Sequence, residues 1–319
     1  MVVKVASVSF SKDPILRVEL AARFPAAVFN DAGVRFKTPD LKTYLADADA
    51  AVIGLEKIDD EVLTACPRLR MIAKYGVGLD GIDLDACRTR GVAVGWTPGV
   101  NRRSVAELAV CFLIGLFRNV FQTSSWLRGG TWNKDGGRQL TGATIGIIGL
   151  GHVGRDIVGL LKPFGCRILA NDVVDVSAFA REHGIEVVEK DVLFRDADAV
   201  SLHVPLTPLT RALINADVLS RFKPGAFLLN TSRGEVVDQE SVKQALLSGR
   251  LGGAALDVFE VEPPTDVELL GLPEFVGTPH IGGNAREAIL AMGRSAIAHL
   301  DRFFPAALPR PASTTERLD

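Results

Sequence analysis

Short apolar, β-branched runs alternate with amphipathic stretches along the first 97 residues. The runs are VVKVASVSF, AAVFN, AAVIGL, RMIAKYG and VAVGW, and stretches such as DDEVLTACP and DLDACRTRG stand between them. The runs have the length and composition of buried strands, and the stretches between them have a helical pattern. Strands that alternate with helices favour a parallel sheet covered on both faces. Residues 2–97 are therefore predicted to form an α/β domain.

A second series of strands and helices follows the stretch WTPGVN. It opens with a long predicted helix, Arg103 to Gly129, in which Val105 and Phe112 lie on one apolar face. Seven apolar runs come next: TIGIIGL, CRILAND, IEVV, AVSLHV, AFLLNTS, GGAALDVF and EFVGTPH. This pattern predicts a second doubly wound parallel-sheet domain of the Rossmann type.

The last predicted helix spans Ala285 to Phe303, and a proline-rich tail that we expect to be poorly ordered follows it. A helix that returns to the first domain would make that domain discontinuous. We therefore predict a first domain of residues 1–97 plus 284–319 and a second domain of residues 98–283, with hinges near Thr97 and Gly282.

Composition narrows the class of partner. The chain has 319 residues, 47% of them hydrophobic, which is enough for two buried cores. The net charge is −2 and no long basic run occurs, so nucleic acid and membrane surfaces are not expected partners. A small soluble molecule is favoured instead.

The cysteines and the apolar segments indicate a cytoplasmic protein without a metal site. The four cysteines are far apart, form no CxxC pair and have no neighbouring histidine, so free thiols are expected. The N-terminal stretch alternates like a strand and lacks the layout of a signal peptide. The most apolar window, Val105 to Phe117, contains Glu107 and is too short to span a bilayer.

The stretch TIGIIGLGHVG predicts a dinucleotide site. A strand leads into Gly149, Gly151 and Gly154 in the GxGxxG order, with His152 and Val153 inside the loop, and an apolar helix follows. The glycines permit a tight turn and close approach of the backbone to a pyrophosphate at the helix N-terminus. The next strand ends in Asp172, which can accept bonds from a ribose diol and would repel a 2′-phosphate, so NAD is favoured over NADP. A glycine-rich turn with Asp172 as a solvated cap is the alternative.

Three polar side chains follow other strands of this domain. AFLLNTSRG ends near Arg233, GGAALDVFEVEP leads to Glu262, and EFVGTPH ends in His280. Ligands of open α/β sheets bind beyond the carboxyl ends of the strands, so the three groups are candidates for one site. Taken separately, each also has an ordinary structural interpretation: an ion-pair partner, a loop carboxylate and a histidine at a strand end.

Five motifs in this order make a resemblance specific: GLGHVG, SLHVPLTP, NTSRGEVVD, ALDVFEVEPP and TPHIGG. They resemble the D-2-hydroxyacid dehydrogenase family, which includes D-3-phosphoglycerate dehydrogenases. The resemblance extends from KYGVGLDGID to the last helix. It implies a flavodoxin-like substrate domain and a Rossmann NAD-binding domain with a cleft between them, and a homodimer formed through the cofactor domain.

The resemblance also implies a catalytic triad of Arg233, Glu262 and His280, and the roles suit these residue types. Arg233 would bind the carboxylate and carbonyl of a 2-oxo acid with its planar fork. His280 would exchange a proton with the substrate oxygen while hydride moves between C2 and the nicotinamide. Glu262 would orient the imidazole and favour its protonated form.

Further cofactor contacts are implied by the same motifs. His203 and Pro205 resemble residues that line the cofactor pocket, although His203 also suits a purely structural role. Thr231 would present mainly its backbone. Asp257 resembles a partner of the nicotinamide carboxamide or, alternatively, a strand-end cap, and Ser104 is predicted to reach the nicotinamide side.

The first domain supplies the implied substrate loop, KYGVGLDGID. Backbone N–H groups around Val77 and Gly78 would receive the substrate carboxylate. Lys74 is either a surface lysine or a second cation for a substrate with a distal anion, and Asn101, with Arg102, could also face the cleft. Gly81 stands where the family most often has Asn, which predicts a softer loop.

The leading functional hypothesis is an NAD-dependent oxidoreductase of a D-2-hydroxy acid with a second anionic group, such as 3-phosphoglycerate or a phosphonate or sulfonate analogue. A glyoxylate or hydroxypyruvate reductase is the alternative within the same chemistry. A phosphite-type dehydrogenase and an NADH-sensing, corepressor-like binding protein are the others, whereas formate dehydrogenases use Gln at the position of Glu262. The short tail after the last helix predicts no regulatory domain.

Overall fold

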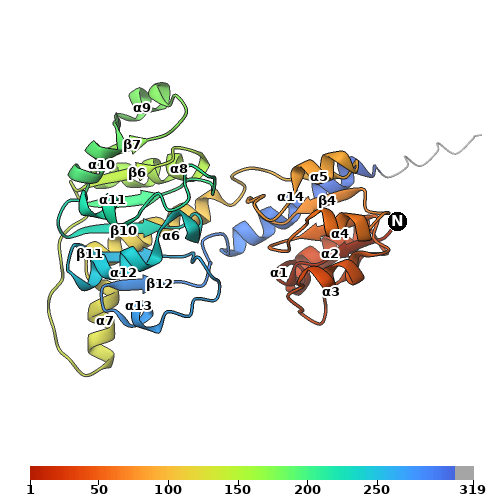
Figure 1. Cartoon of the computed structure of the whole chain (residues 1–319), viewed down its shortest axis with the longest axis horizontal. Helices are drawn as coiled ribbons and strands as arrows, with labels where there is room; N and C mark the ends of the chain where they lie inside the picture. The colour runs from red at the N-terminus through yellow and green to blue at the C-terminus, as the bar shows by residue number, and fades with distance from the viewer. Residues whose placement is uncertain (306–319) are drawn as a thin grey trace, which may run out of the picture. The chain divides into compact units, whose positions relative to one another are not determined.

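The computed structural model describes residues 1–305; the tail of residues 306–319, predicted to be poorly ordered, lies outside the described residues. The chain divides into two compact units, one of Met1–Thr97 with the residues from Leu290 onward, the other of Pro98–Ile289 (Figure 1). The sequence placed the return to the first unit between residues 283 and 284. In the structure this return lies inside the last helix, α14 (Arg286–Phe303).

The first unit contains a five-stranded parallel sheet with the order β2-β1-β3-β4-β5. The strands are β1 (Val3–Val5), β2 (Val28–Phe29), β3 (Ala50–Ile53), β4 (Met71–Lys74) and β5 (Ala93–Gly95). Its helices are α1 (Val8–Lys12), α2 (Pro14–Arg23), α3 (Thr38–Leu45), α4 (Asp60–Ala65), α5 (Leu84–Thr89) and the part of α14 from Leu290 onward. This strand order is the flavodoxin-like one.

The first strand is shorter than the sequence predicts. A strand was expected from Val2 to Phe10, but β1 ends at Val5 and α1 begins at Val8. The hydroxyl of Ser7 accepts a hydrogen bond from the backbone N–H of Phe10 at 3.3 Å, which caps the helix. Alternating apolar residues therefore continue into a helix because a serine supplies the cap.

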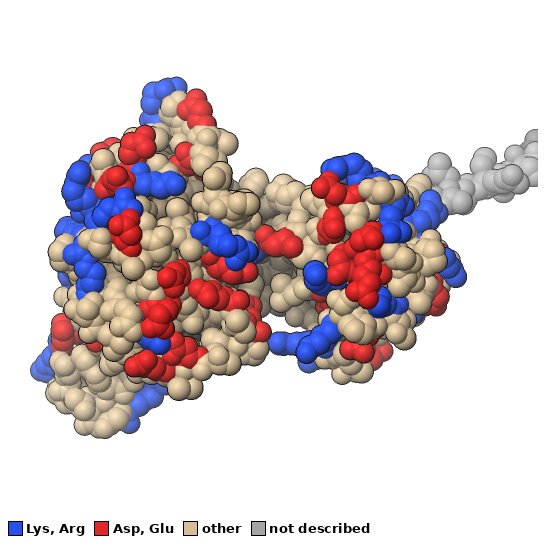
Figure 2. All heavy atoms as spheres, in the orientation of Figure 1, with Lys and Arg blue, Asp and Glu red and all other residues tan. Residues whose placement is uncertain are grey.

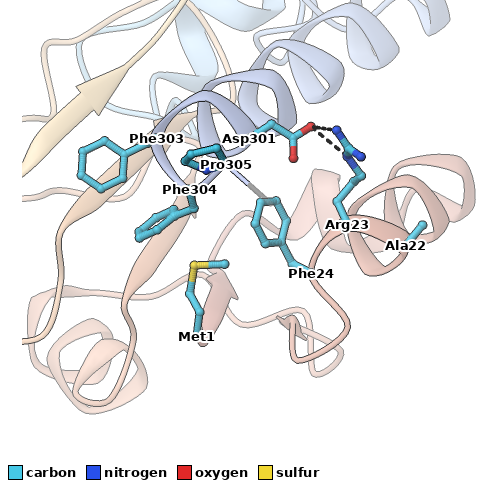
Figure 3. Close-up of a pocket in the computed structure, with 8 residues that line it drawn as sticks. All are labelled: Met1, Ala22, Arg23, Phe24, Asp301, Phe303, Phe304 and Pro305. Atoms are coloured by element: carbon cyan, nitrogen blue, oxygen red, sulfur yellow. Dashed lines mark hydrogen bonds and ion pairs between the residues drawn. The ribbon is translucent and has the colours of Figure 1, made fainter. Parts of the chain in front are cut away.

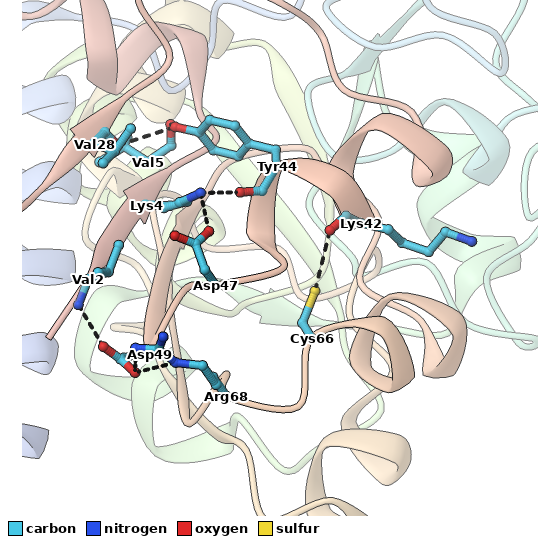
Figure 4. A network of polar contacts seen from close by, with 10 residues as sticks. All are labelled: Val2, Lys4, Val5, Val28, Lys42, Tyr44, Asp47, Asp49, Cys66 and Arg68. Atoms are coloured by element: carbon cyan, nitrogen blue, oxygen red, sulfur yellow. Dashed lines mark hydrogen bonds and ion pairs between the residues drawn. The ribbon is translucent and has the colours of Figure 1, made fainter.

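Polar contacts bind the amino-terminal part of this unit together (Figure 4). Lys4 forms an ion pair with Asp47 at 2.5 Å, and the Tyr44 hydroxyl donates to the carbonyl of Val5 at 3.0 Å. Burial raises the pKa of Tyr44 to about 12, and the negative charges of Asp31 and Glu56 add to this. This network holds α3 against β1 and uses no predicted site residue.

The second unit contains a seven-stranded parallel sheet with the order β12-β11-β10-β9-β6-β7-β8. The strands are β6 (Thr144–Ile148), β7 (Arg167–Asn171), β8 (Glu186–Val187), β9 (Ala199–Leu202), β10 (Ala226–Asn230), β11 (Leu251–Leu256) and β12 (Phe275–Gly277). Helices and short 3-10 turns connect them: α6 (Arg102–Phe117), α7 (Val120–Arg128), α8 (His152–Leu161), η1 (Lys162–Phe164), α9 (Ser177–His183), α10 (Lys190–Asp196), α11 (Ala216–Ser220), η2 (Gly234–Val236), α12 (Gln239–Leu247) and α13 (Val267–Gly271). From β6 the chain builds the sheet outward first on one side and then on the other, so a topological switch point lies between β6 and β9. The two parallel-sheet units confirm the predicted fold class.

One long predicted helix is two helices. The pattern predicted a helix from Arg103 to Gly129, but α6 ends at Phe117 and α7 begins at Val120, with a bend of 65°. Asn119 lies in the left-handed region at φ 50°, which stops the first helix. Gly115 leaves room for the ring of Phe121, because a Cβ at this glycine would lie 2.0 Å from that ring.

The surface charge on one face and the composition of the helices bear on the partners that the sequence predicted. Lys, Arg, Asp and Glu side chains are interspersed over the face of each unit seen in Figure 2. Within residues 1–305, no single helix is long and apolar enough to cross a membrane. The bent pair of α6 and α7 would suffice by length and composition, but half of α6 is buried in the protein core.

Candidate active site

His280 and Glu262 form a close pair beyond the carboxyl ends of β11 and β12. Nδ1 of His280 lies 2.9 Å and 3.1 Å from the two carboxylate oxygens of Glu262. The backbone N–H of Phe259 also donates to Glu262, at 3.2 Å, which fixes the carboxylate from behind. Because Nδ1 donates to Glu262, proton exchange with a substrate is left to Nε2 of the imidazole.

The pair shifts both ionisation equilibria. The hydrogen bond to Glu262 raises the pKa of His280, against the opposing effect of burial, and the negative charges of Glu262 and Asp257 add to the rise. Burial alone would raise the pKa of Glu262, but the bond to His280, its charge and that of Arg233 together lower it. Both shifts favour the form of the pair in which an imidazolium faces a carboxylate.

The turn that carries His280 is an unusual backbone conformation. His280 has φ 55°, in the left-handed region, and its N–H donates to the carbonyls of Asp257 and Thr278 at 2.9 Å each. A non-glycine residue persists there only where its surroundings hold it, and such residues concentrate at functional sites. Asn284 adds a bond from its side chain to the His280 carbonyl at 3.2 Å.

Asp257 is the acid that holds this turn. Its side chain is buried, and its carboxylate accepts bonds from the Thr278 hydroxyl at 2.5 Å and from the N–H groups of Ile281 and Gly282 at 2.8 Å and 2.7 Å. Burial raises the pKa of Asp257, and these bonds oppose the rise. Of the two interpretations that the sequence left open, the structure displays the strand-end cap; contact with the nicotinamide stays a prediction.

Arg233 follows β10, and the backbone around it is held by side-chain hydrogen bonds and by close packing. The buried side chain of Asn230 donates to the Arg233 carbonyl at 2.8 Å, and its amide oxygen accepts from the N–H and hydroxyl of Ser232. The next residue, Gly234, lies so close to Phe259 that a Cβ would be 1.9 Å from that carbonyl carbon. The positive charge of Arg233 influences the pKa values of both Glu262 and His280, so the three predicted catalytic groups are brought together.

The glycine loop after β6 fits a dinucleotide. Gly149 has φ 95°, and a Cβ there would lie 2.4 Å from the carbonyl oxygen of His203. A Cβ on Gly154 would lie 2.1 Å from the Gly149 carbonyl oxygen, whereas Gly151, which begins α8, faces open space. Two glycines are thus needed for the loop itself, and the third leaves the helix N-terminus approachable by a pyrophosphate.

Asp172 touches the glycine loop directly. Its carboxylate accepts a bond from the Leu150 N–H at 2.6 Å and another from the Val174 N–H at 3.1 Å. Asp172 therefore braces the loop as well as standing at the end of β7, where a ribose would bind. The sequence did not predict this bracing contact, which has no motif of its own.

His203 lies at the switch point, at the end of β9. Its Nε2 lies 2.8 Å from the Ser201 hydroxyl, and its Nδ1 lies 3.5 Å from the Thr231 hydroxyl. Burial lowers the pKa of His203 to about 3, so the ring is neutral at physiological pH. A neutral hydrogen-bonding ring agrees with a structural role more than with proton transfer. Pro205 is exposed beyond it, and its carbonyl accepts from Thr210 at 2.6 Å.

The predicted substrate loop follows β4 in the first unit. Val77 and Gly78 are partly exposed. Lys74 is buried, with 6% of its surface exposed, and its ammonium donates to the carbonyl of Gly54. Lys74 is therefore not the surface lysine of the simpler sequence interpretation. The Glu56 carboxylate accepts from the N–H of the same Gly54 at 2.5 Å.

Two predicted residues, Asn101 and Ser104, contact the segment that follows His280. Asn101 is buried, its amide oxygen has no hydrogen-bond partner among residues 1–305, and its amide nitrogen would lie 2.7 Å from a Cβ at Gly283. The Ser104 hydroxyl donates to the carbonyl of Gly282 at 2.5 Å and accepts from the N–H of Ala285 at 3.2 Å. The neighbouring Arg102 is exposed.

A cavity of about 570 Å³ lies elsewhere, at the amino end of β1 in the first unit (Figure 3). Its lining includes Met1, Phe24 and Phe304 and an ion pair of Arg23 with Asp301 at 2.9 Å. It contains no predicted site residue and lies opposite the strand ends where ligands of α/β sheets bind. Among residues 1–305, no group of three or more His, Cys, Asp or Glu side chains is arranged to hold a metal ion.

Comparison with known proteins decides the family. Residues 110–282 match the family described as "D-isomer specific 2-hydroxyacid dehydrogenase, NAD binding domain". The chain belongs to this family. The matched segment covers the glycine loop, Arg233, Glu262 and His280, and it identifies the seven-stranded unit as the NAD-binding domain of a 2-hydroxyacid dehydrogenase. Family members are NAD-dependent oxidoreductases, as the sequence motifs implied.

Individual dehydrogenases of the family resemble different lengths of the chain. It is 36% identical over 260 residues to a hydroxypyruvate reductase of Thermotoga maritima, covering 80% of this chain and 84% of that enzyme. It is 37% identical to a D-3-phosphoglycerate dehydrogenase of Mycobacterium leprae, covering 85% of this chain but only 52% of that enzyme. The solved D-lactate dehydrogenase of Aquifex aeolicus with NAD and lactic acid superposes with a TM-score of 0.83, 26% identity and 95% coverage of both chains.

The supporting residues were the part of the site that the sequence did not reveal. Asn230, Thr278 and the Phe259 N–H fix the catalytic groups, and all three lie in motifs that the sequence singled out, but none of them was given a role there. Asn230 carried a usable signal, because a buried amide inside an apolar run requires partners.

Proposed function

We propose that the chain reduces a short 2-oxo acid with NADH, and oxidises the corresponding D-2-hydroxy acid with NAD, in the manner of a glyoxylate or hydroxypyruvate reductase. The observation that carries this proposal is the His280–Glu262 pair beside Arg233 at the end of the cofactor sheet. A raised imidazole pKa next to a guanidinium suits proton transfer to an oxygen that is developing negative charge.

The protein side chains divide the work as follows. Arg233 binds the carboxylate and the adjacent carbonyl and stabilises the charge that develops on the carbonyl oxygen. His280 donates its Nε2 proton to that oxygen during reduction and removes the proton during oxidation. Glu262 keeps the imidazole oriented through Nδ1 and stabilises its protonated form.

NAD is the cofactor for which these residues are suited, and it supplies or accepts the hydride when bound. Gly149, Gly151 and Gly154 with the N-terminus of α8 would hold the pyrophosphate, and Asp172 the adenosine ribose. His203 and Thr231 lie at the switch point beside them.

Lys74 and Glu56 direct the choice of substrate. The ammonium of Lys74 is engaged by the Gly54 carbonyl, and a carboxylate, that of Glu56, binds the N–H of the same residue. A distal phosphate approaching this position would meet a negative charge and a lysine that already has an acceptor. A short substrate without a second anion is therefore favoured over the phosphorylated class that the sequence placed first.

A 2-oxo acid panel tests this proposal. The purified protein is assayed with NADH and glyoxylate, hydroxypyruvate or phosphohydroxypyruvate, and kcat/KM is compared. We expect the two short acids to exceed the phosphorylated one by about tenfold or more, the scale of one unfavourable charge contact. A preference for phosphohydroxypyruvate would restore the second-anion hypothesis, which the 37% identity to a phosphoglycerate dehydrogenase supports.

Phosphite oxidation and cofactor-sensing without turnover are separated by the same assay. Phosphite with NAD is included as an additional reaction. Tight NADH binding with no turnover of any acid would favour the corepressor-like alternative.

We also propose that two copies associate through the NAD-binding unit. No residue of α7 is buried, and Leu127 and Trp132 are 57% and 76% exposed. Light scattering after gel filtration is expected to give the mass of a dimer, and Leu127→Asp should shift it to a monomer. Val267→Asp, at an apolar position 81% exposed on α13, is the matched control and should stay dimeric.

A further inference from the structure

The chain segment that leaves the histidine turn is held from two sides. Gly282, two residues after His280, donates its N–H to the carboxylate of Asp257 at 2.7 Å, and its carbonyl accepts from the hydroxyl of Ser104 at 2.5 Å. Ser104 lies in the first turn of α6, and Asp257 follows β11. Gly282 is thus fixed between two secondary-structure elements that are distant in the sequence.

The fit around Gly282 is tight. A Cβ at Gly282 would lie 2.9 Å from the Asp257 carboxylate and 3.6 Å from the methyl groups of Val105. The Ser104 hydroxyl also accepts from the Ala285 N–H at 3.2 Å, so it contacts the segment on both sides of Gly283. A buried backbone carbonyl and an N–H near a helix start are both satisfied by this one side chain.

The position of His280 depends on how the segment around Gly282 is held. His280 is in the left-handed region, and the bonds that over-determine it come from Asp257 on one side and from the segment after it on the other. A small rotation of that segment would move the imidazole relative to Glu262 and Arg233. Misplacement of a catalytic group by a fraction of an ångström to an ångström lowers rates substantially.

We propose that Ser104 is a positioning residue for His280, acting through Gly282, rather than a contact of the nicotinamide. The proposal rests on the proposed dehydrogenase function, since it assigns Ser104 a part in the proton-transfer geometry of that reaction. It also accounts for a hydroxyl at this position, because the residue must donate to one backbone group and accept from another.

The test separates turnover from cofactor binding. In Ser104→Ala we expect kcat for the preferred 2-oxo acid to fall about tenfold, the scale of one lost hydrogen bond, while the Kd for NADH from fluorescence titration stays within about twofold. Ser104→Thr, which keeps the hydroxyl, should restore most of kcat. A raised Kd for NADH with unchanged kcat would overturn the proposal and return Ser104 to the nicotinamide side.

A matched variant controls for general loss of stability. Ser241 lies in the first turn of α12, and its hydroxyl makes a comparable bond to Asp238 at 2.6 Å, away from the histidine turn. Ser241→Ala should lower the melting temperature about as much as Ser104→Ala but leave kcat unchanged. Equal losses of kcat in both variants would overturn the positioning role.

A second readout does not depend on turnover. Amide hydrogen exchange at Gly282 and Ala285 should accelerate in Ser104→Ala and not in Ser241→Ala. If the wild-type protein turns over no 2-oxo acid, the proposed function fails, and unchanged exchange at these amides would separately reject the contact itself. Faster exchange together with a lower kcat supports both.

Discussion

The carboxyl ends of the two parallel sheets carry their functional groups in different ways. Beyond the seven-stranded sheet, His280 and its turn are held by side-chain bonds from Asp257, Glu262, Asn284 and Ser104. Beyond the five-stranded sheet, backbone bonds contribute to holding the loop after Lys74, such as the bond from the Ile58 N–H to the Gly81 carbonyl at 2.8 Å. The first edge therefore has the fixed geometry that proton transfer requires, and we propose that the second edge accommodates the substrate.

This difference between the two sheet edges indicates which residues should affect turnover and which should affect substrate choice. Groups that exchange protons or bind developing charge require fixed positions, and these lie in the NAD-binding unit. Groups that discriminate between substrates need only present charge and space, and we propose this role for Glu56 and Lys74 in the other unit. Variants at the first edge should therefore abolish turnover, whereas variants at the second should redistribute it among substrates.

Removal of the proton carrier should have the largest effect. His280→Ala is expected to lower kcat by about a thousandfold, the contribution of a positioned general acid and base. The Kd for NADH should stay close to the wild-type value, because the glycine loop and Asp172 are untouched. Steady-state kinetics with a fluorescence titration of NADH measures both quantities, and an unchanged reduction rate would reject the catalytic assignment.

Replacement of the Arg233 guanidinium should have the second largest effect on turnover. Arg233→Lys keeps the charge but loses the planar fork, so kcat/KM for the preferred acid should fall about a hundredfold. The loss should be similar for short and phosphorylated acids, since both have the same 2-oxo carboxylate. A loss confined to one class would place Arg233 among the selectivity groups instead.

Weakening the His280–Glu262 pair should change the pH dependence. Glu262 raises the pKa of His280, so Glu262→Gln should make reduction, which needs the imidazolium, decline at a lower pH, with about a tenfold loss on the alkaline side. A pH profile of kcat with matched buffers measures this shift. An unmoved alkaline limb would show that Glu262 does not set the ionisation of His280.

The His280–Glu262 pair should also make the stability of the fold depend on pH. The raised pKa of His280 stabilises the fold at pH values below 6.5, and this stability is lost as the pH rises through the pKa of the folded state. The lowered pKa of Glu262 stabilises the fold at pH values above 4.5, and this stability is lost as the pH falls through the pKa of the folded state. Glu262→Gln should therefore destabilise the fold most between pH 4.5 and 6.5. Thermal unfolding across that range is the measurement.

Replacement of Glu56, beyond the five-stranded sheet, should have the smallest effect. Glu56→Gln removes the negative charge next to Gly54, so kcat/KM for phosphohydroxypyruvate should rise about threefold while that for glyoxylate changes little. Asp59→Asn, which changes a carboxylate that caps α4, is the matched control. A uniform change for all acids would indicate an effect on the fold and not on selectivity.

Much of this architecture was predictable from the sequence because it repeats a simple rule. Apolar runs alternating with amphipathic stretches predict a parallel sheet, and polar residues that follow those runs meet at one edge. Arg233, Glu262 and His280 were found in this way, although 47 residues separate the first from the last. The exceptions are positions where one side chain overrides the pattern: Ser7, which ends β1 early by capping α1, and Asn119, which breaks the long helix.

The supporting contacts were less predictable because they depend on distances across the fold. Ser104 was predicted to reach the nicotinamide side, and Asp257 was predicted to be either a nicotinamide partner or a strand-end cap. In the structure their side chains bind the backbone around His280. The burial of Lys74 under Gly54 likewise follows from the register of β3 and β4, in which Ile53 pairs with Lys74. A linear pattern does not contain this information.

We propose above all that hydride is transferred to the C2 carbon of a 2-oxo acid to give the D product. The most direct measurement incubates the wild-type protein with NADH and hydroxypyruvate, follows the loss of NADH absorbance, and resolves the glycerate formed by chiral chromatography. A parallel incubation with glyoxylate follows NADH loss alone, because its product, glycolate, is achiral. We predict equal amounts of NAD and product, with D-glycerate as the enantiomer formed from hydroxypyruvate. Formation of L-glycerate, or no NADH consumption with any 2-oxo acid, would contradict it.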